Sequence, residues 1–286
     1  MSSKIKKIIS SELGKYISVI IIIVVLFGFW IYKNQKPELI KVDLPPAKEH
    51  QDFVSQNTNE DLILEEEIVV AEKPREEIKQ VIEEPVEIIK PLETPGEPQA
   101  INLALPFTSQ APTGNWDQPY QDACEEASLL MVDYYYQAKK MPSQEAVETI
   151  LSSMVSWQEE NWGGHHNLPI AKLAEYIRLF YDYRVEVVEN VTVSQLKDFL
   201  NEGRPIIVPA DGHKLANPFF SGDGPDYHML VIKGYVDNNF ITNDPGTRRG
   251  EDFVYSSQNM MDSIFDWDTK KSSATGPKNV LVLYND

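Results

Sequence analysis

Residues 227–244 read YHMLVIKGYVDNNFITND, two apolar segments on either side of residues 237–239. Both segments are rich in the β-branched and large apolar residues that favour strands, and Asp-Asn-Asn between them is a turn signal. The stretch therefore predicts a β-hairpin. His228 begins the first strand and Asp244 ends the second, so we expect their side chains to lie close together.

Further helix and strand signals surround this hairpin. Apolar residues recur at helical spacing in several segments before it, and one of these opens with the capping box Thr192-x-x-Gln195. Helices followed by an antiparallel sheet indicate an α+β domain over residues 101–286, with the N-terminal helices packed on the sheet. The helices are expected from residue 124 and at 144–159, 169–181 and 193–202, and further strands at 102–106, 205–208 and 280–284.

Cys124 is the only cysteine of the chain, so no intramolecular disulfide can form. Without further context a lone cysteine is a small buried apolar residue. Here Ala127, Leu130 and Met131 follow it at helical spacing, so Cys124 opens a helix. The unpaired N–H groups and the dipole of a helix start stabilise a thiolate, which makes Cys124 a candidate nucleophile.

A cysteine nucleophile needs a base that accepts its proton and a third group that orients the base. Among the five histidines, His228 stands on a predicted strand, with Asp244 at the end of the neighbouring strand. Taken alone, the sequence around His228 indicates a histidine of the core, and that around Asp244 indicates a turn residue before Pro245. Together with the helix-opening Cys124 they form a candidate triad of nucleophile, general base and orienting carboxylate.

Residues 16–32 are predicted to form an uncleaved transmembrane helix. The run ISVIIIIVVLFGFWIY is uncharged, nearly long enough to cross a hydrocarbon core of about 30 Å, and followed by no cleavage site for a signal peptidase. Lysines are more frequent before the run than closely after it. The positive-inside rule therefore places residues 1–15 in the cytoplasm and the C-terminal domain outside the cell membrane.

Residues 33–100 are predicted to be a disordered linker. The segment is acidic and rich in proline, and Phe53 is its one aromatic residue, so it buries too little apolar surface to offset the entropy of ordering. A spacer between membrane and domain is the favoured interpretation, and a partner-binding motif is the alternative. The net charge of −18 argues against nucleic acid as a partner.

Four segments of the predicted domain resemble the C39-like family of bacterial papain-like cysteine peptidases. The resemblance covers residues 101–286 and implies a papain-like fold, no cofactor, and the chain order Cys–His–Asp, which falls on Cys124, His228 and Asp244. The segments are Gln110-Ala111-Pro112, Cys124-Glu125-Glu126-Ala127-Ser128, residues 227–235 and Asn243-Asp244-Pro245-Gly246-Thr247.

The resemblance also implies a glutamine, upstream of the cysteine, that donates to the oxyanion together with the backbone N–H of Cys124. Gln110 is the favoured residue, because it belongs to the matching segment. Gln118, which has the spacing of papain-like enzymes in general, and Gln121 are the alternatives. Glu125 stands where bacteriocin-processing members of the family have glycine, so cleavage of double-glycine leaders is not expected.

The sequence thus predicts a membrane-anchored enzyme that hydrolyses a peptide or isopeptide bond of a peptide or protein substrate through an acyl-enzyme. Transamidation on the same fold is one alternative, and an inactive module that binds peptide or cell-wall material is another. No metal is expected, because His165 and His166 lack the spacing of metal ligands and no second cysteine is present.

Overall fold

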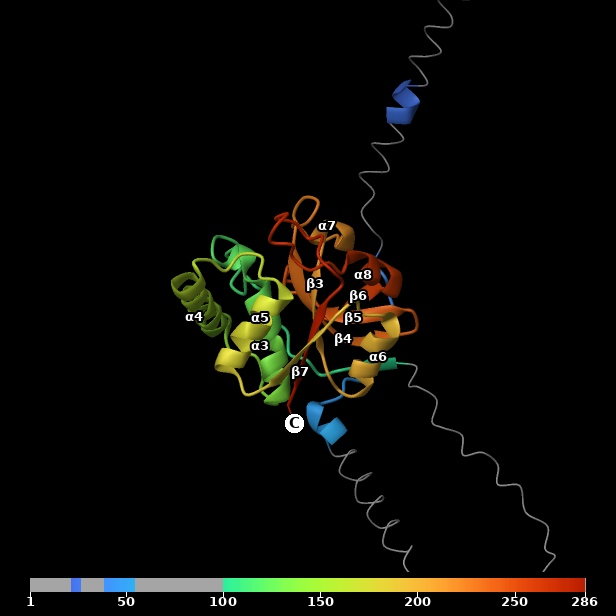
Figure 1. Ribbon diagram of the computed structural model, residues 1–286. Helices are drawn as coiled ribbons and strands as arrows, with labels where there is room; N and C mark the ends of the chain where they lie inside the picture. Colours follow the sequence, from blue (N-terminus) through green and yellow to red (C-terminus); the bar gives the residue numbers. More distant parts are fainter. Residues whose placement is uncertain (1–21, 27–38, 55–99, 286) are drawn as a thin grey trace, which may run out of the picture. The chain divides into compact units, whose positions relative to one another are not determined.

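The computed structural model describes residues 22–26, 39–54 and 100–285 (Figure 1). The chain divides into two compact units, Met1–Leu39 and Ile40–Asp286. In the first unit, residues 22–26 are helical and their apolar side chains are exposed. The rest of the predicted span 16–32, and the predicted cytoplasmic residues 1–15, lie outside the described residues. No helix of the described part is long and apolar enough to cross a membrane.

One antiparallel sheet is the scaffold of the second unit. Its strands follow in the order β2-β7-β3-β4-β5-β6, and β1 pairs with the end of β4. Every residue of β3 and β7 is buried, as expected for strands that are covered on both faces. The strands are β1 (Ala100–Asn102), β2 (Arg184–Val188), β3 (Ile206–Ala210), β4 (His228–Val236), β5 (Asn239–Asn243), β6 (Phe253–Ser256) and β7 (Val280–Tyr284).

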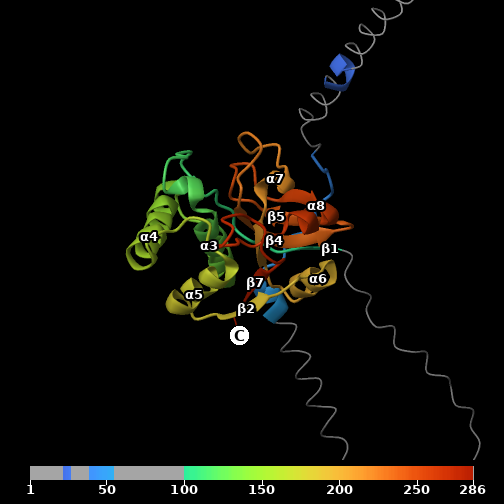
Figure 2. The same cartoon turned by 45° about the horizontal axis from the view of Figure 1, so that its top comes forward.

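Helices pack around this sheet, with α3, α4 and α5 grouped together beside it (Figures 1 and 2). Except for Tyr134, every residue of α3 is buried, because the helix lies between β4 and α4. The predicted capping box of Thr192 and Gln195 at the start of α6 is confirmed. The helices are η1 (Tyr120–Asp122), α3 (Cys124–Tyr136), α4 (Gln144–Trp162), α5 (Ile170–Phe180), α6 (Val193–Asn201), α7 (Gly212–Leu215) and α8 (Ser257–Ser263).

The predicted hairpin is formed by β4 and β5. Val236 pairs with Asn239, so the turn consists of residues 237 and 238, and Val231 pairs with Asn243. Asp237 has a φ of +53°, a left-handed conformation that aspartate tolerates better than most residues. The hairpin brings the start of β4 and the end of β5 to the same edge of the sheet, as its sequence predicts. The α+β prediction is therefore confirmed.

Residues 40–54, which fall within the predicted linker 33–100, belong to the second unit. The Lys48 N–H donates to the Asn102 carbonyl and the Ala104 N–H donates to the Lys48 carbonyl, each over 2.8 Å. Residues 50–54 are helical, and Phe53 is only 7% exposed. Its ring lies against Gly203, where a Cβ atom would come within 2.5 Å of the Phe53 Cγ. Burial of this aromatic ring contributes about 2–3 kcal/mol toward the cost of ordering the segment. Residues 55–99 lie outside the described residues.

Candidate active site

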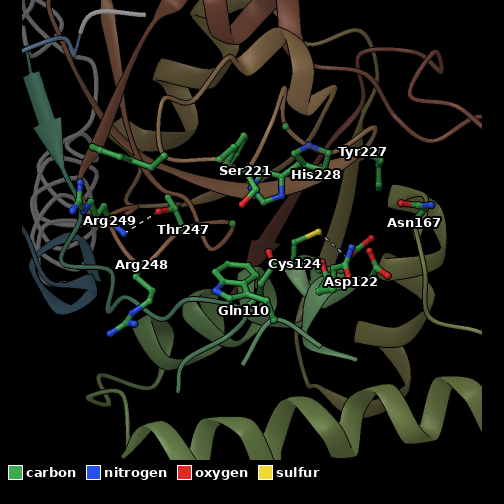
Figure 3. Close-up of a pocket in the computed structure, with 18 residues that line it drawn as sticks. Gln110, Asp122, Cys124, Asn167, Ser221, Tyr227, His228, Thr247, Arg248 and Arg249 are labelled. Atoms are coloured by element: carbon green, nitrogen blue, oxygen red, sulfur yellow. Dashed lines mark hydrogen bonds between the residues drawn. The ribbon is translucent and has the colours of Figure 1, made fainter. Parts of the chain in front are cut away.

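Cys124 is the first residue of α3 and lines a cavity of about 620 Å³ (Figure 3). The preceding residue, Ala123, offers no side-chain cap to the helix. The first N–H groups of α3, including that of Cys124, have no acceptor within the helix. The sequence prediction that Cys124 opens a helix is thus confirmed, and its backbone N–H is available to a developing negative charge in the cavity.

His228 lines the same cavity and is paired with Asp244. The His228 Nε2 lies 2.7 Å from the Asp244 Oδ1, and both side chains are buried. The predicted proximity of the two residues is therefore confirmed. Because Asp244 occupies Nε2, Nδ1 is the ring nitrogen left to act as a base. Figure 3 shows the imidazole beside Cys124.

Asp244 is held by four hydrogen-bond donors. Besides His228, the Gly246 N–H donates to Oδ1 over 3.0 Å, and Oδ2 accepts from Asn217 Nδ2 over 3.0 Å and from the Tyr255 hydroxyl over 2.7 Å. Burial alone would raise the pKa of Asp244, but the charge of His228 and these bonds hold that pKa below its ordinary value. The carboxylate therefore stays ionised, with both oxygens fixed in place.

Two neighbours fix the imidazole ring of His228. Phe220 packs edge-on against it, with ring centroids 5.3 Å apart. A Cβ atom at Gly246 would come within 2.7 Å of the His228 Cε1, so residue 246 has to be glycine for the ring to keep this position. Ring orientation is thus determined by packing as well as by the Asp244 bond.

The thiol of Cys124 does not donate to His228 but to Glu125. The Cys124 Sγ lies 3.1 Å from Glu125 Oε2, while Glu125 Oε1 accepts from the Leu168 N–H over 2.9 Å. Burial raises the pKa of Glu125 to about 7. Burial, followed by the charge and hydrogen bond of Glu125, raises the pKa of Cys124 well above its ordinary value. The helix start favours formation of the thiolate, whereas the neighbouring carboxyl group of Glu125 opposes it.

A second buried carboxyl group, Glu126, follows on the same helix. Its Oε1 accepts from Gln158 Nε2 over 2.7 Å, and burial, followed by the charge of Glu125, raises its pKa to about 8. Sequence reasoning missed the roles of both glutamates. The available signal was two acidic residues at the start of a helix that is otherwise almost entirely apolar.

Of the three glutamines proposed for the oxyanion, Gln110 and Gln121 line the cavity and Gln118 does not. Gln110 is buried, and its Nε2 donates to the carbonyls of Tyr120, over 3.1 Å, and Gln121, over 2.7 Å. Both amide hydrogens are therefore used to hold the segment before α3, and neither points freely at a substrate. Gln118 donates to Asp122 instead.

The two ends of the cavity differ in charge. Arg248 and Arg249 lie on one side of Cys124 and His228, and Asp122 and Asn167 on the other (Figure 3). Within the described part of the chain, no three histidine, cysteine or acidic side chains are grouped so that they could hold a metal ion.

Comparison with known proteins gives one family match. The sequence profile of the Peptidase_C39 like family matches residues 102–274. A crystal structure of a Bacillus anthracis protein assigned to the C39-like peptidases superposes with a TM-score of 0.45 at 11% sequence identity, covering 66% of this chain and 99% of that chain. No curated protein matches the sequence.

Proposed function

The chain belongs to the Peptidase_C39 like family, and on this premise we propose that it is a cysteine peptidase that hydrolyses a peptide or isopeptide bond. One observation carries the proposal: His228, which is paired with the buried carboxylate of Asp244, lines the same cavity as a cysteine at a helix start. Such a constellation provides the nucleophile, base and orienting group of covalent acyl transfer.

In the proposed reaction, the Nδ1 of His228 accepts the proton of the Cys124 thiol, and the sulfur attacks the substrate carbonyl carbon. Asp244 remains ionised and stabilises the imidazolium. The imidazolium then protonates the leaving amine, which departs and leaves an acyl group on Cys124. His228 next takes a proton from a water molecule that attacks the acyl group, and the product carboxylic acid is released as the thiol is restored.

The backbone N–H of Cys124 is one donor to the oxyanion of the tetrahedral intermediate. Gln110 supplies a second donor if it gives up one of its two carbonyl partners when substrate binds. The thiol likewise has to leave Glu125 for His228 before attack. Substrate entry into the cavity would therefore have to rearrange two hydrogen bonds of the free enzyme.

We further propose that the catalytic unit lies outside the cell membrane, anchored through residues 16–32. The uncharged apolar run, the lysines before it and the helical residues 22–26 support this. On intact cells that express the full-length chain, external protease should release the C-terminal unit. If the unit is protected until the cells are lysed, the orientation is reversed.

The catalytic proposal is tested on the full-length protein with an electrophilic thiol probe and a pool of peptides. Wild type should be labelled at Cys124 and should cleave peptides, whereas Cys124→Ser should do neither and His228→Ala should cleave none. His213→Ala is a matched control, because His213 is exposed, pairs with Asp226 over 2.8 Å and does not line the cavity.

Two other outcomes would replace hydrolysis. If wild type and His228→Ala react alike with the probe and neither cleaves a peptide, the inactive binding module takes the place of the enzyme. If products carry an added amine in place of a new carboxylate, the acyl-enzyme is transferred to amines, and the protein is a transamidase.

A further inference from the structure

Two neighbouring arginines, Arg248 and Arg249, line one end of the cavity without a carboxylate partner in the described part of the chain. Asp252, the nearby aspartate that follows them in sequence, pairs with Lys233 over 2.6 Å instead. Two unpaired guanidinium groups in one cavity are unexpected in a chain with a net charge of −18. We refer to Arg248 and Arg249 as the arginine pair.

The loop that carries the arginine pair is fixed in place. The Asp244 N–H donates to the Gly250 carbonyl over 2.9 Å, which closes the loop, and the Gln110 N–H donates to the Pro245 carbonyl over 3.0 Å. A Cβ atom at Gly250 would lie 1.8 Å from the Asp244 carbonyl oxygen, so the closure requires glycine. The same loop thus positions Asp244 and the arginine pair, and it fixes their backbones relative to one another.

Each arginine rests against a different wall of the cavity. The Arg249 guanidinium lies over the Phe219 ring, 4.9 Å from its centroid, and the Arg249 N–H donates to the Thr247 hydroxyl over 3.2 Å. The Arg248 Nη1 lies near Gly114, 3.2 Å from where a Cβ atom would be. The pair therefore lies at one end of the cavity, and among the described residues no acceptor takes a hydrogen bond from either guanidinium group.

Among the described residues that line the opposite end of the cavity, none is a lysine or an arginine. Asp122 lies there and pairs with His166 over 2.9 Å, and Glu125 lies next to the nucleophile. A substrate that extends through the cavity therefore meets cations on only one side of Cys124 (Figure 3). Guanidinium groups bind carboxylates through paired, charge-assisted hydrogen bonds.

We propose that the arginine pair is a subsite that binds a carboxylate of the substrate on one side of the scissile bond. This inference rests on the proposed peptidase function. The carboxylate belongs either to an acidic side chain or to the free C-terminus of a peptide, and both present the same chemistry to the two guanidinium groups.

The test uses sets of peptides in which one position carries glutamate, glutamine or lysine. Successive sets place this variable residue at each position on either side of a cleaved bond. Turnover is measured with the full-length wild type, and binding with full-length Cys124→Ser. The preference of the subsite can therefore be measured even without turnover. At one position the glutamate peptide should be favoured over the glutamine peptide by about tenfold to a hundredfold, the range of a charge-assisted hydrogen bond.

The variant Arg248→Gln with Arg249→Gln should bring the ratio of glutamate to glutamine peptide close to one. Lys270→Gln with Lys271→Gln is the matched control, because it removes two neighbouring cations from a loop outside the cavity and should keep the ratio. Peptides with a free or an amidated C-terminus distinguish the sources. A preference for the free over the amidated C-terminus that the arginine variant loses assigns the subsite to the terminal carboxylate, whereas a preference for glutamate over glutamine that the arginine variant loses assigns it to a side chain.

The failures of the two proposals are distinguishable. The carboxylate subsite is overturned, and the peptidase is left standing, if cleavage is intact but rates and affinities are equal in both comparisons: glutamate with glutamine peptides at every position, and peptides with a free with those with an amidated C-terminus. Absence of any cleavage, with binding that still prefers glutamate and loses that preference in the arginine variant, supports the subsite and refutes the peptidase.

Discussion

Replacement of Glu125 by Gln should make Cys124 a faster nucleophile. Glu125 accepts the thiol hydrogen bond at 3.1 Å and takes its second bond from the Leu168 N–H. In the variant, the amide oxygen can keep the bond from Leu168, which turns the amide nitrogen toward the sulfur. A carboxylate that repels the thiolate is thereby exchanged for a donor that stabilises it.

The size of the effect follows from the charge that is removed. A negative charge about 4 Å from the thiolate repels it by about 4 kcal/mol at an effective dielectric constant near 20. This energy corresponds to a factor of roughly 10³ in the equilibrium constant for thiolate formation. Nucleophilicity per thiolate falls as the thiol becomes more acidic, with a Brønsted coefficient of about 0.4–0.5. Alkylation at neutral pH should therefore be faster on the order of tenfold to fiftyfold.

The assay is the rate of iodoacetamide labelling of Cys124 between pH 5 and pH 10, followed by mass spectrometry of the full-length protein. Glu126→Gln is the matched control, since it makes the same substitution at the next residue of α3, where the carboxyl group accepts from Gln158 rather than from the sulfur. The reasoning is refuted if Glu125→Gln follows the wild-type profile, or if Glu126→Gln accelerates labelling as much.

Three further predictions concern the orienting carboxylate Asp244, the buried acid Glu126 and the domain boundary. Asp244→Asn should lower kcat by about 10³–10⁴ in a peptide assay while iodoacetamide still labels Cys124, because the imidazole loses its orientation; an unchanged kcat would contradict the assigned role. Burial raises the pKa of Glu126 to about 8, so the folded state favours the protonated side chain. This contribution to the free energy of unfolding is fully present below pH 4.5 and is lost as the pH rises through 8. In wild type this contribution should lower the free energy of unfolding by on the order of 4 kcal/mol between pH 4.5 and pH 8.5, as measured by thermal unfolding. Glu126→Gln should lack this part of the fall, and a fall of the same size in the variant would contradict the prediction. Phe53→Ala should destabilise the second unit by about 3 kcal/mol in urea unfolding if residues 40–54 are part of it, whereas no change would return them to the linker.

Local sequence signals were sufficient for much of the fold. The turn at residues 237–239 and the apolar segments around it predict the β4–β5 hairpin, and register then brings His228 near Asp244. The capping box at Thr192 and the spacing after Cys124 locate two helix starts. These features depend on neighbours in the chain, and this is why they could be predicted.

The linker boundary could not be predicted in this way. Composition averages over residues 33–100 and indicates disorder, whereas Phe53 packs against Gly203, which is distant in sequence. The donors to Asp244 had no local signal for the same reason: Asn217 lies in a loop and Tyr255 on β6.

The sequence by itself determined the α+β class, the helix start at Cys124 and the three residues of the candidate triad. Only the tertiary structure decided the contacts in the cavity. The Cys124 thiol donates to Glu125, the Gln110 amide donates to two backbone carbonyls, and the arginine pair has no carboxylate partner among the described residues. Propensity, capping and periodicity act over a few residues. Burial, the pKa shifts it causes, and hydrogen bonds between distant segments arise only when the whole chain has packed.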